Sequence, residues 1–493
     1  MRNRRLLINS FSNFFGRVAG ALVNFITIPF YVRMLGAESY GVVGFVVSLQ
    51  ASLAILDFGL AVTVNREVAR SEGTDPASLG NTVATLAWVY CLTALTVFGV
   101  LLVASPWLAN HWLHLKELSP TIVEVCLMLA AAAIALRWPV ALYSGVMQGA
   151  QKQVMANLIS GGIGVVRAAG GLAALVSVAP RLEVFFGWQV VSAAAELLIA
   201  RHFAWRCLPA GSFQAGRFDP AVLAGVWRFA AGFGTVAAVG VFVANLDRLL
   251  VARLLPLDQL GVLSMLYAAA GILTLCGTAI SVAAFPRLVN SCRASDRRTE
   301  LASELAASVR LVEALVMPGF LVFAFFPQSL LMVWTGASVL PEASENILRL
   351  LALGAAINAL GSPFYMTVIA DGAVNWLLCA NLVALALLLP LYWFGLPRFG
   401  LPLAAAGWCL LTTILLFASV LRCRCLVELP RVKAAQIGYW LAVALLFAAV
   451  AKLSAHLGAK PWANVGLGGA LAFVSLAGTR EARGMILVRI RRK

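Results

Sequence analysis

Charged side chains are scarce in this chain: Asp, Glu, Lys and Arg together make up 12% of its 493 residues. Soluble domains contain about 25% charged residues. The chain is also 61% hydrophobic, which is more apolar surface than a water-soluble fold can bury, so soluble enzymes and disordered proteins are excluded. The hydrophobic residues form long runs such as 83–103 and 435–451, unlike the alternating segments of about ten residues in an outer-membrane barrel. The sequence predicts an all-α polytopic membrane protein.

The groups that carry catalysis and metal binding are also few. There are four histidines and nine cysteines, and most cysteines lie inside apolar runs. Cys423 and Cys425 have no second pair beside them, as a metal site of this type would need. The sequence has no glycine-rich phosphate loop followed by lysine and no long external loop for a sugar-ligating enzyme. We therefore expect no enzyme, no catalytic residue, no metal and no cofactor.

Helices long enough to cross a bilayer account for most of the chain. A spanning helix needs about 20 apolar residues, and apolar runs of that length recur along the whole sequence. Prolines lie at or near the ends of many runs, as helix punctuation should. We predict about 14 spans, near residues 6–31, 41–63, 81–104, 120–139, 154–177, 185–203, 229–252, 260–285, 308–328, 345–370, 375–396, 401–421, 435–456 and 461–479.

Basic residues outnumber acidic ones, 37 to 21, which gives a formal net charge of +16. Of the 37, 24 fall on segments predicted to be cytoplasmic, six on outer segments and seven within spans. Cytoplasmic loops of membrane proteins collect Lys and Arg. This bias predicts that both termini are cytoplasmic, and it explains the basic balance without a nucleic-acid partner.

An internal repeat connects two loops on the predicted outer side. Residues 33–42 match residues 253–262 at a constant offset of 220, and the matched positions include Gly41 with Gly261. The two segments follow the first and seventh predicted spans. An even number of helices between them gives the two halves the same orientation, as in parallel transporter repeats.

The repeat predicts four parts of the chain. Residues 1–203 form an N-lobe of six helices, 204–228 a basic cytoplasmic linker, 229–422 a C-lobe of six helices, and 423–493 two further helices with a basic tail. We expect residues 6–203 to superpose on 229–422 by rotation about the membrane normal. Two such lobes suggest an alternating-access transporter with its site between them.

Short motifs within about residues 20–290 resemble one family of membrane proteins. They are NFITIPFYVRMLGAESYG (24–41), LDFGL (56–60), VMQGAQK (146–152), NLDRLLVAR (245–253) and FPR (285–287). In this order they resemble the bacterial polysaccharide (oligosaccharide) flippases of the multidrug/oligosaccharidyl-lipid/polysaccharide (MOP) superfamily.

The resemblance implies a V-shaped fold of two lobes. It also implies a flippase that moves undecaprenyl-diphosphate-linked oligosaccharides across the bacterial inner membrane, for exopolysaccharide, capsule or O-antigen synthesis. Expected partners are the lipid-linked oligosaccharide, membrane lipids and the polymerase or export machinery of the pathway. A MATE-type multidrug cation antiporter and a peptidoglycan-precursor (lipid II) flippase are the alternatives. The sequence leaves open the sugar repeat unit, the coupling ion and the oligomeric state.

The first predicted helix carries polar residues along one face, among them Asn13, Arg17 and Asn24. An arginine in the middle of a membrane costs about 2.5–3.5 kcal/mol, so we expect Arg17 to face a water-filled cavity. Helix–helix packing through small and polar residues is the alternative for this face. The whole set is Ser10, Asn13, Arg17, Gly20, Asn24, Thr27 and Tyr31.

Other predicted spans supply further candidates. A diphosphate needs cations in a site of low dielectric constant, and arginine offers forked donors for its oxygens. Arg248, Asn245 and Arg167 therefore join the residues of the first helix as candidate substrate-binding residues. Several glycines lie near Arg167, so close helix packing is the alternative there.

Asp57 and Asp247 are the acids predicted to lie deep in spans. Either could bind a coupling proton or cation, and either could instead be the structural partner of an arginine. A cation antiporter should present deep acids to its drugs, whereas Arg17 would repel them. The sequence therefore favours a flippase for an anionic lipid-linked sugar.

Overall fold

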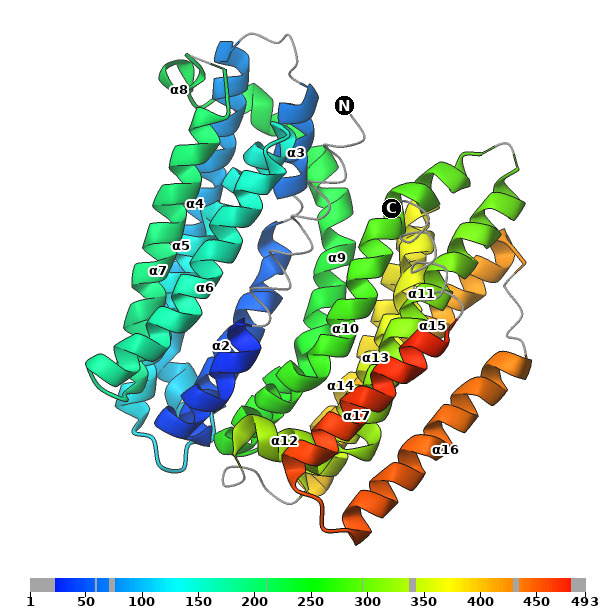
Figure 1. Ribbon diagram of the computed structural model, residues 1–493. Coiled ribbons are helices and arrows are strands. Elements are labelled where there is room, and N and C mark those ends of the chain that lie inside the picture. Colours follow the sequence, from blue (N-terminus) through cyan, green and yellow to red (C-terminus); the bar gives the residue numbers. More distant parts are fainter. Residues whose placement is uncertain are drawn as a thin grey trace, which may run out of the picture. The chain divides into compact units, whose positions relative to one another are not determined.

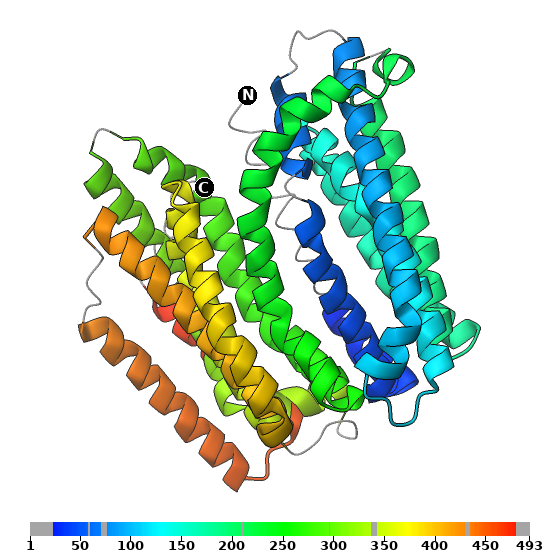
Figure 2. The same ribbon diagram turned by 180° about the vertical axis from the view of Figure 1, so that it is seen from behind.

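The computed structural model describes residues 23–57, 60–70, 76–209, 211–294, 296–336, 343–428 and 434–479. Within these residues the chain is almost entirely helical and forms no β-strand (Figures 1 and 2). Ten of the described helices are long and apolar enough to cross a membrane. The predicted all-α polytopic fold is confirmed, while the count of about 14 spans stays a prediction.

The chain divides into two compact units, residues 1–261 and 262–493. Unit 1 contains the helix Val23–Leu35, α2 (Ala37–Leu53), η1 (Ala54–Asp57), α3 (Leu60–Arg70), α4 (Pro76–Trp107), η2 (Leu108–Trp112), α5 (Pro120–Gly149), α6 (Gln153–Ser177), α7 (Leu182–Arg206), α8 (Ser212–Ala215), α9 (Pro220–Leu254) and the start of α10 (Leu257–Cys292).

Helix α5 is the packing centre of unit 1, where it contacts α3, α4, α6 and α7. Small residues allow this closeness, as they do in membrane helix pairs. A Cβ atom at Gly145 would come within 2.6 Å of the Ala61 carbonyl oxygen on α3, and one at Gly149 within 2.6 Å of the Asn65 carbonyl oxygen. The close packing fixes the rotation of α5, and therefore the direction in which its polar residues point.

Two helices of unit 1 differ from the predicted spans. The span expected at 41–63 is divided by the 3₁₀ turn η1, which ends at Asp57. Aspartate is a poor helix former, and here its carboxylate accepts a hydrogen bond from the Tyr90 hydroxyl on α4. Helix α5 runs ten residues past the end expected at residue 139, because Pro139 is accommodated inside the helix.

Unit 2 continues α10 and adds α11 (Arg297–Phe325), α12 (Pro327–Thr335), α13 (Ser344–Ala370), α14 (Val374–Phe399), α15 (Leu401–Leu426), α16 (Ala434–His456) and α17 (Pro461–Gly478). Helices α13 and α15 pack closely, and a Cβ atom at Gly354 would come within 2.3 Å of the Trp408 ring. Helix α16 contacts α11 and α17, and α17 contacts α11 and α12.

The boundary between the units differs from the expected linker at 204–228. Helix α9 belongs to unit 1, where it packs against α2, η1, α3 and α4. The expected linker residues include α8 and the first part of α9. The four-part division into 1–203, 204–228, 229–422 and 423–493 depends on the superposition of two repeats and stays a prediction.

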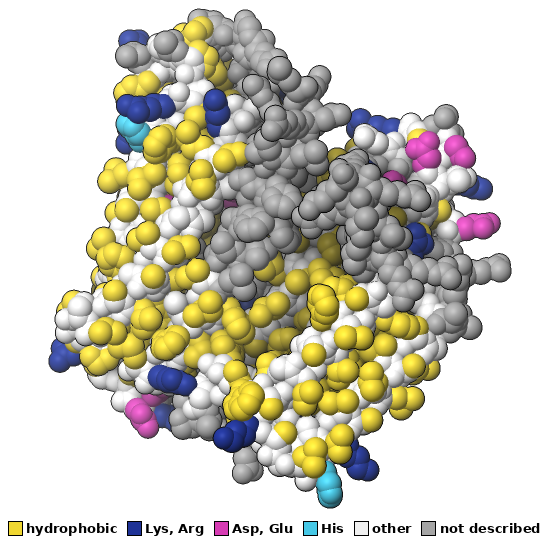
Figure 3. Space-filling view, in the orientation of Figure 1, with side chains coloured by type: hydrophobic (Ala, Val, Ile, Leu, Met, Phe, Trp, Pro, Cys, Tyr) yellow, Lys and Arg dark blue, Asp and Glu magenta, His cyan; other side chains and the backbone are white. Residues whose placement is uncertain are grey.

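The outer surface of the helices is strongly apolar. Hydrophobic side chains cover most of the helix surfaces visible in Figure 3, and charged side chains gather mainly toward the helix ends. On α4, Trp88, Leu92, Leu95 and Val103 are each more than 60% exposed. Side chains of this kind are stable at such exposure in contact with lipid, as a membrane-spanning chain requires.

Candidate functional site

Two groups of polar residues lie along the helices of unit 1, one on α5–α7 and one on η1 and α9. Asn13 and Arg17 lie outside the described residues. Asn24 is exposed on the helix Val23–Leu35, and its backbone carbonyl accepts a hydrogen bond from the Thr27 hydroxyl at 3.1 Å.

Three charged residues come together on α5, α6 and α7, which run side by side in Figures 1 and 2. Arg167 Nη2 donates a hydrogen bond of 2.6 Å to Glu196 Oε2. Arg137 Nε lies 3.9 Å from the same oxygen, and Arg137 Nη2 donates to Gln189 Oε1 at 2.7 Å. We call Arg137, Arg167 and Glu196 the α5–α7 triad. Two cations share one anion, so the triad carries a net charge of +1.

Sequence reasoning missed two members of this triad. The predicted span 120–139 placed Arg137 two residues from a helix end. Helix α5 instead continues to Gly149, and the Arg137 side chain is only 16% exposed. Glu196 is the only acidic residue in the predicted span 185–203, and that isolation was the signal that could have marked it as a partner of Arg167.

The glycines near Arg167 do serve close packing. A Cβ atom at Gly170 would come within 2.2 Å of the Trp188 ring, and one at Gly171 within 2.6 Å of the Tyr31 hydroxyl. Trp188 Nε1 donates to the Arg167 carbonyl at 3.1 Å, and Tyr31 donates to the Ala168 carbonyl at 2.5 Å. Packing therefore accounts for the backbone of α6 at this level, whereas the Arg167 guanidinium group belongs to the triad.

The candidates on α9 form a separate group. Asn245 and Asp247 are buried, at 7% and 3% exposure, and Arg248 is half-buried. The Asn245 amide donates to the Val241 carbonyl at 2.8 Å, and its Oδ1 accepts from Arg248 Nη1 at 3.1 Å. Asn245 thus orients the Arg248 guanidinium group along its own helix.

Asp57 and Asp247 were expected to bind a coupling ion or to pair with an arginine. Asp57 is half-buried at the end of η1 and accepts the hydrogen bond from Tyr90. The helices that carry the two acids pack together, because α9 contacts η1. Within the described residues, no group of three or more His, Cys, Asp and Glu side chains comes together as a metal site would need.

The two glycines of the repeat lie in direct contact within unit 1. A Cβ atom at Gly41 would come within 2.1 Å of the Leu257 carbonyl oxygen, and one at Gly261 within 2.0 Å of the Ala37 carbonyl oxygen. Leu257 corresponds to Ala37 at the offset of 220. The contact is therefore reciprocal, as two elements related by a twofold axis would make it. We call it the glycine crossing.

The loop after η2 is fastened beside this crossing. The Glu38 carboxylate accepts hydrogen bonds from the backbone N–H groups of residues 116–118 at 2.6–3.2 Å. Lys116 Nζ lies 3.0 Å from Asp258 Oδ2. Glu38 and Asp258 are matched positions of the repeat, so both copies of the motif hold the same loop.

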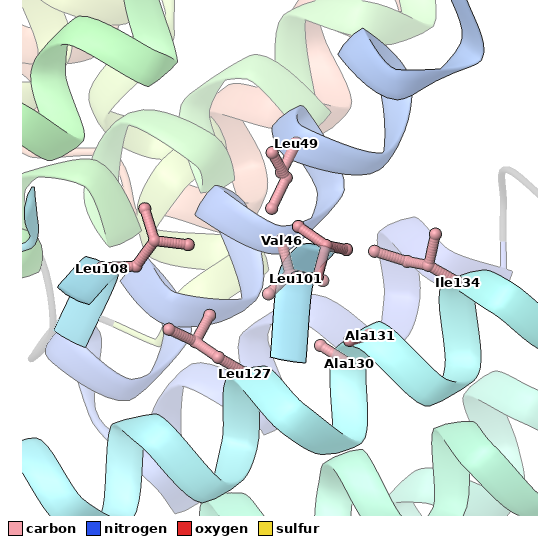
Figure 4. Close-up of a pocket in the computed structure, with 8 residues that line it drawn as sticks. All are labelled: Val46, Leu49, Leu101, Leu108, Leu127, Ala130, Ala131 and Ile134. Carbon is pink, nitrogen blue, oxygen red and sulfur yellow. The ribbon is translucent and has the colours of Figure 1, made fainter. Parts of the chain in front are cut away.

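Two of the cavities lined by described residues contain none of the candidate site residues. One, of about 10 Å³, is an apolar gap between α2, α4, η2 and α5 (Figure 4). A cavity of this size holds at most one water molecule and would need polar partners for it. Its lining residues are Val46, Leu49, Leu101, Leu108, Leu127, Ala130, Ala131 and Ile134.

The larger cavity, of about 360 Å³, lies between α11 and α16 in unit 2. It is lined mostly by apolar side chains, with the Glu313 carboxylate at its wall. Gln436 Nε2 and Trp440 Nε1 both donate to this carboxylate. Through these two donors from α16, the Glu313 carboxylate holds that helix on α11.

The fold defines the class of protein. The chain superposes on the structure titled "Lipid II flippase MurJ, inward closed conformation" with a TM-score of 0.73 at 10% identity, covering 96% of this chain and 98% of that one. A multidrug resistance MATE family transporter of the MOP superfamily, in an inward-facing conformation, gives a TM-score of 0.65 at 12% identity, covering 82% and 94%. At these identities the likeness shows the fold, which is that of the MOP transporters.

Sequence comparison identifies the family within this class of protein. The model of the polysaccharide biosynthesis protein family matches residues 6–291. The Shigella flexneri protein named "Putative O-antigen transporter" is 24% identical over 409 residues, covering 82% of this chain and 94% of that protein. The chain belongs to the polysaccharide biosynthesis protein family, and its fold is like that of a MATE family transporter of the MOP superfamily.

Proposed function

We propose that the chain is a flippase for undecaprenyl-diphosphate-linked oligosaccharides. It moves them from the cytoplasmic to the periplasmic leaflet of the bacterial inner membrane by alternating access, for the synthesis of exopolysaccharide, capsule or O-antigen. No covalent bond changes in this process, so the protein is not an enzyme. The family match and the named relative from Shigella flexneri support this proposal.

The observation that carries the proposal is the sign of the charge of the α5–α7 triad. The triad has one more cation than anions, whereas Arg248 on α9 lies next to the buried acid Asp247. A carrier of cationic drugs would bring its cargo against this charge. An anionic diphosphate or an acidic sugar is instead attracted by it.

The glycine crossing supports alternating access. The reciprocal contact of Gly41 with residue 257 and of Gly261 with residue 37 favours parallel repeats, with lobes at 1–203 and 229–422 and the helices of 423–493 outside them. The loop of residues 116–118, held by Glu38, lies beside the crossing. In alternating access the site opens to one side of the membrane at a time, so the other side must be closed by a contact of this kind.

The site residues follow from the proposal. Arg17, Asn13 and Asn24 on the first helix, with Arg248, Asn245 and Arg167, bind the substrate, because their donors fit phosphate and sugar oxygens. Asp57 and Asp247 are the groups that couple transport to an ion. The termini lie in the cytoplasm, and the partners are the lipid-linked oligosaccharide, membrane lipids and the polysaccharide polymerase or export machinery.

Deletion of the gene tests the proposal. We expect surface polysaccharide to disappear while lipid-linked repeat units accumulate on the cytoplasmic side, measured by labelling of the lipid extract. Unchanged polysaccharide together with lost resistance to cationic drugs would instead indicate a MATE-type antiporter. Accumulation of lipid II with arrest of cell-wall synthesis would indicate a peptidoglycan-precursor flippase.

A further inference from the structure

The α5–α7 triad lies well inside the helices that carry it. With a rise of about 1.5 Å per residue, Arg137 is about 18 Å from the end of α5 at Gly149, and Arg167 is about 21 Å from the start of α6 at Gln153. Glu196 is about 15 Å from the end of α7 at Arg206 by the same rise. All three distances run from the predicted cytoplasmic side. The hydrocarbon core of a bilayer is about 30 Å thick, so the triad is near its middle.

The charges of the triad do not balance. Both arginines direct their ion pairs to the same carboxylate oxygen of Glu196, at 2.6 and 3.9 Å. The third hydrogen-bond partner, Gln189, is neutral. Removing an unpaired charge from water costs several kcal/mol, and a lipid core offers no counter-ion. The extra positive charge therefore needs an anion from outside the triad.

The donors of the triad are also incompletely used. Arg137 Nε and Arg167 Nε are buried, and neither has a hydrogen-bond partner among the described residues. An arginine presents five N–H donors in a rigid fork that matches the oxygens of phosphate and carboxylate groups. Two such forks that converge on one carboxylate oxygen leave donors for a second oxyanion beside it.

The triad is closed on one side and open on the other. Toward the predicted outer side, Trp188 and Tyr31 pack directly on Gly170 and Gly171. Toward the predicted cytoplasmic side, a Cβ atom at Gly164 would meet no atom of the described residues within 4 Å. On that side the same face of α6 continues with small and polar residues: Gln153, Asn157, Ser160 and Gly164. Arg167, 27% exposed, lies at the inner end of this face.

We infer that Arg137 and Arg167 form a binding site for an oxyanion of the transported molecule, reached along the polar face of α6 from the cytoplasmic side. Glu196 holds the two guanidinium groups in place and offsets one of their charges when the site is empty. The oxyanion is either the diphosphate of the carrier lipid or a carboxylate on an acidic sugar. This inference rests on the proposed function and adds Arg137 and Glu196 to its site.

Binding to the purified full-length protein in detergent tests the inference. The probes are farnesyl diphosphate, trigalacturonate and, as the uncharged control, farnesol, and the readout is the Kd from isothermal titration calorimetry. We expect at least one anionic probe to bind, and Arg137→Gln to raise its Kd tenfold or more without changing the weak response to farnesol. The anionic probe that binds identifies the source of the oxyanion.

Three variants keep this test decisive. Arg137→Gln leaves Arg167 and Glu196 as a neutral pair, so a structural role alone predicts a folded protein with unchanged Kd. Arg167→Lys keeps the charge and loses the forked donors, and we expect its Kd to rise several-fold. Arg422→Gln removes one arginine from a similar cluster in unit 2, and its Kd should equal that of the wild type.

Two results would contradict the inferred oxyanion site. One is that neither anionic probe binds to the wild type, and the other is that Arg137→Gln and the wild type have equal Kd values. The proposed function fails separately. If deletion of the gene leaves surface polysaccharide intact while binding still depends on Arg137, the oxyanion site stands and the substrate is another anionic molecule. If deletion stops export while Arg137→Gln binds and exports normally, the proposed function stands and the site does not.

Discussion

Two clusters in this protein place two arginines around one carboxylate. In unit 1 the α5–α7 triad joins Arg137 and Arg167 to Glu196 part-way along three helices. In unit 2, Asp371 accepts hydrogen bonds from Arg297 and Arg422. We call these last three residues the α11–α15 triad.

The two triads have the same charges and a different surrounding. Both carboxylates are buried, at 8% and 7% exposure. The arginines of the α11–α15 triad are 40% and 35% exposed, against 16% and 27% for those of the α5–α7 triad. Arg297 is the first residue of α11, Asp371 follows the last residue of α13, and Arg422 lies in the last turns of α15.

The difference in exposure of the arginines indicates that two arginines around one carboxylate serve different roles in the two units. Both triads leave the Nε atoms of their arginines buried without a hydrogen-bond partner among the described residues. At helix ends, however, the more exposed guanidinium groups reach water, which hydrates the extra charge, so the α11–α15 triad can serve as a clasp between three helices. In the middle of unit 1, water is absent unless a cavity or a ligand brings it. The same composition then leaves one positive charge without an anion, and the inferred oxyanion site depends on that excess charge.

The largest effect should follow from removing the carboxylate in the middle of the membrane. Glu196→Gln leaves two half-buried guanidinium groups without a carboxylate partner in the triad, and we expect the free energy of unfolding to fall by about 3–5 kcal/mol. Thermal unfolding in detergent and the abundance in membranes measure this. Adding Arg137→Gln to Glu196→Gln should restore part of the loss, since one unpaired charge is removed.

Glu183→Gln is the matched control for this prediction, because Glu183 lies in the first turn of the same helix. We expect its unfolding temperature to stay within experimental error of the wild type. An unchanged unfolding temperature in Glu196→Gln itself would show that the triad does not hold α5, α6 and α7 together.

A smaller effect is expected at the glycine crossing, where backbone atoms rather than charges meet. A Cβ atom at Gly261 would overlap the Ala37 carbonyl oxygen at 2.0 Å, so Gly261→Ala should destabilise the protein by about 1–3 kcal/mol. Gly99→Ala on α4 meets no atom within 4 Å and should be neutral or stabilising, because alanine is the better helix former. Equal unfolding temperatures for the two variants would contradict the close crossing.

The smallest loss of stability is expected in the α11–α15 triad. Asp371→Asn removes the shared carboxylate, but Arg297 and Arg422 can turn their exposed guanidinium groups to water. We therefore expect a cost of about 1 kcal/mol, as for partly exposed ion pairs. Measuring the unfolding temperatures of Asp371→Asn and Glu196→Gln side by side tests the comparison directly. An equally large loss of stability in both variants would contradict the difference between the two triads.

Much of the fold could be predicted from the sequence because it depends on local pattern. Long apolar runs predicted helices, and short motifs identified the family that the comparisons confirm. The equivalence of Gly41 and Gly261 in the +220 repeat stays a prediction. The contact between the two glycines was not predicted, because a repeat shows equivalence and not adjacency.

The α5–α7 triad could be predicted only in part. Arg167 was a candidate because a lone arginine in an apolar run is conspicuous. Arg137 was misplaced because the span was predicted to end near residue 139, whereas the helix continues through Pro139, as membrane helices often allow. Which arginine meets Glu196 depends on the rotation of three packed helices, and no single-helix pattern records that rotation.

The most direct test of the account is complementation of the gene deletion with Arg137→Gln. Because this variant leaves Arg167 and Glu196 as a neutral pair, its abundance and unfolding temperature should equal those of the wild type or exceed them. We predict that it nevertheless fails to restore surface polysaccharide, and that lipid-linked repeat units accumulate in the cytoplasmic leaflet. Full restoration of polysaccharide by Arg137→Gln at wild-type abundance would contradict the account.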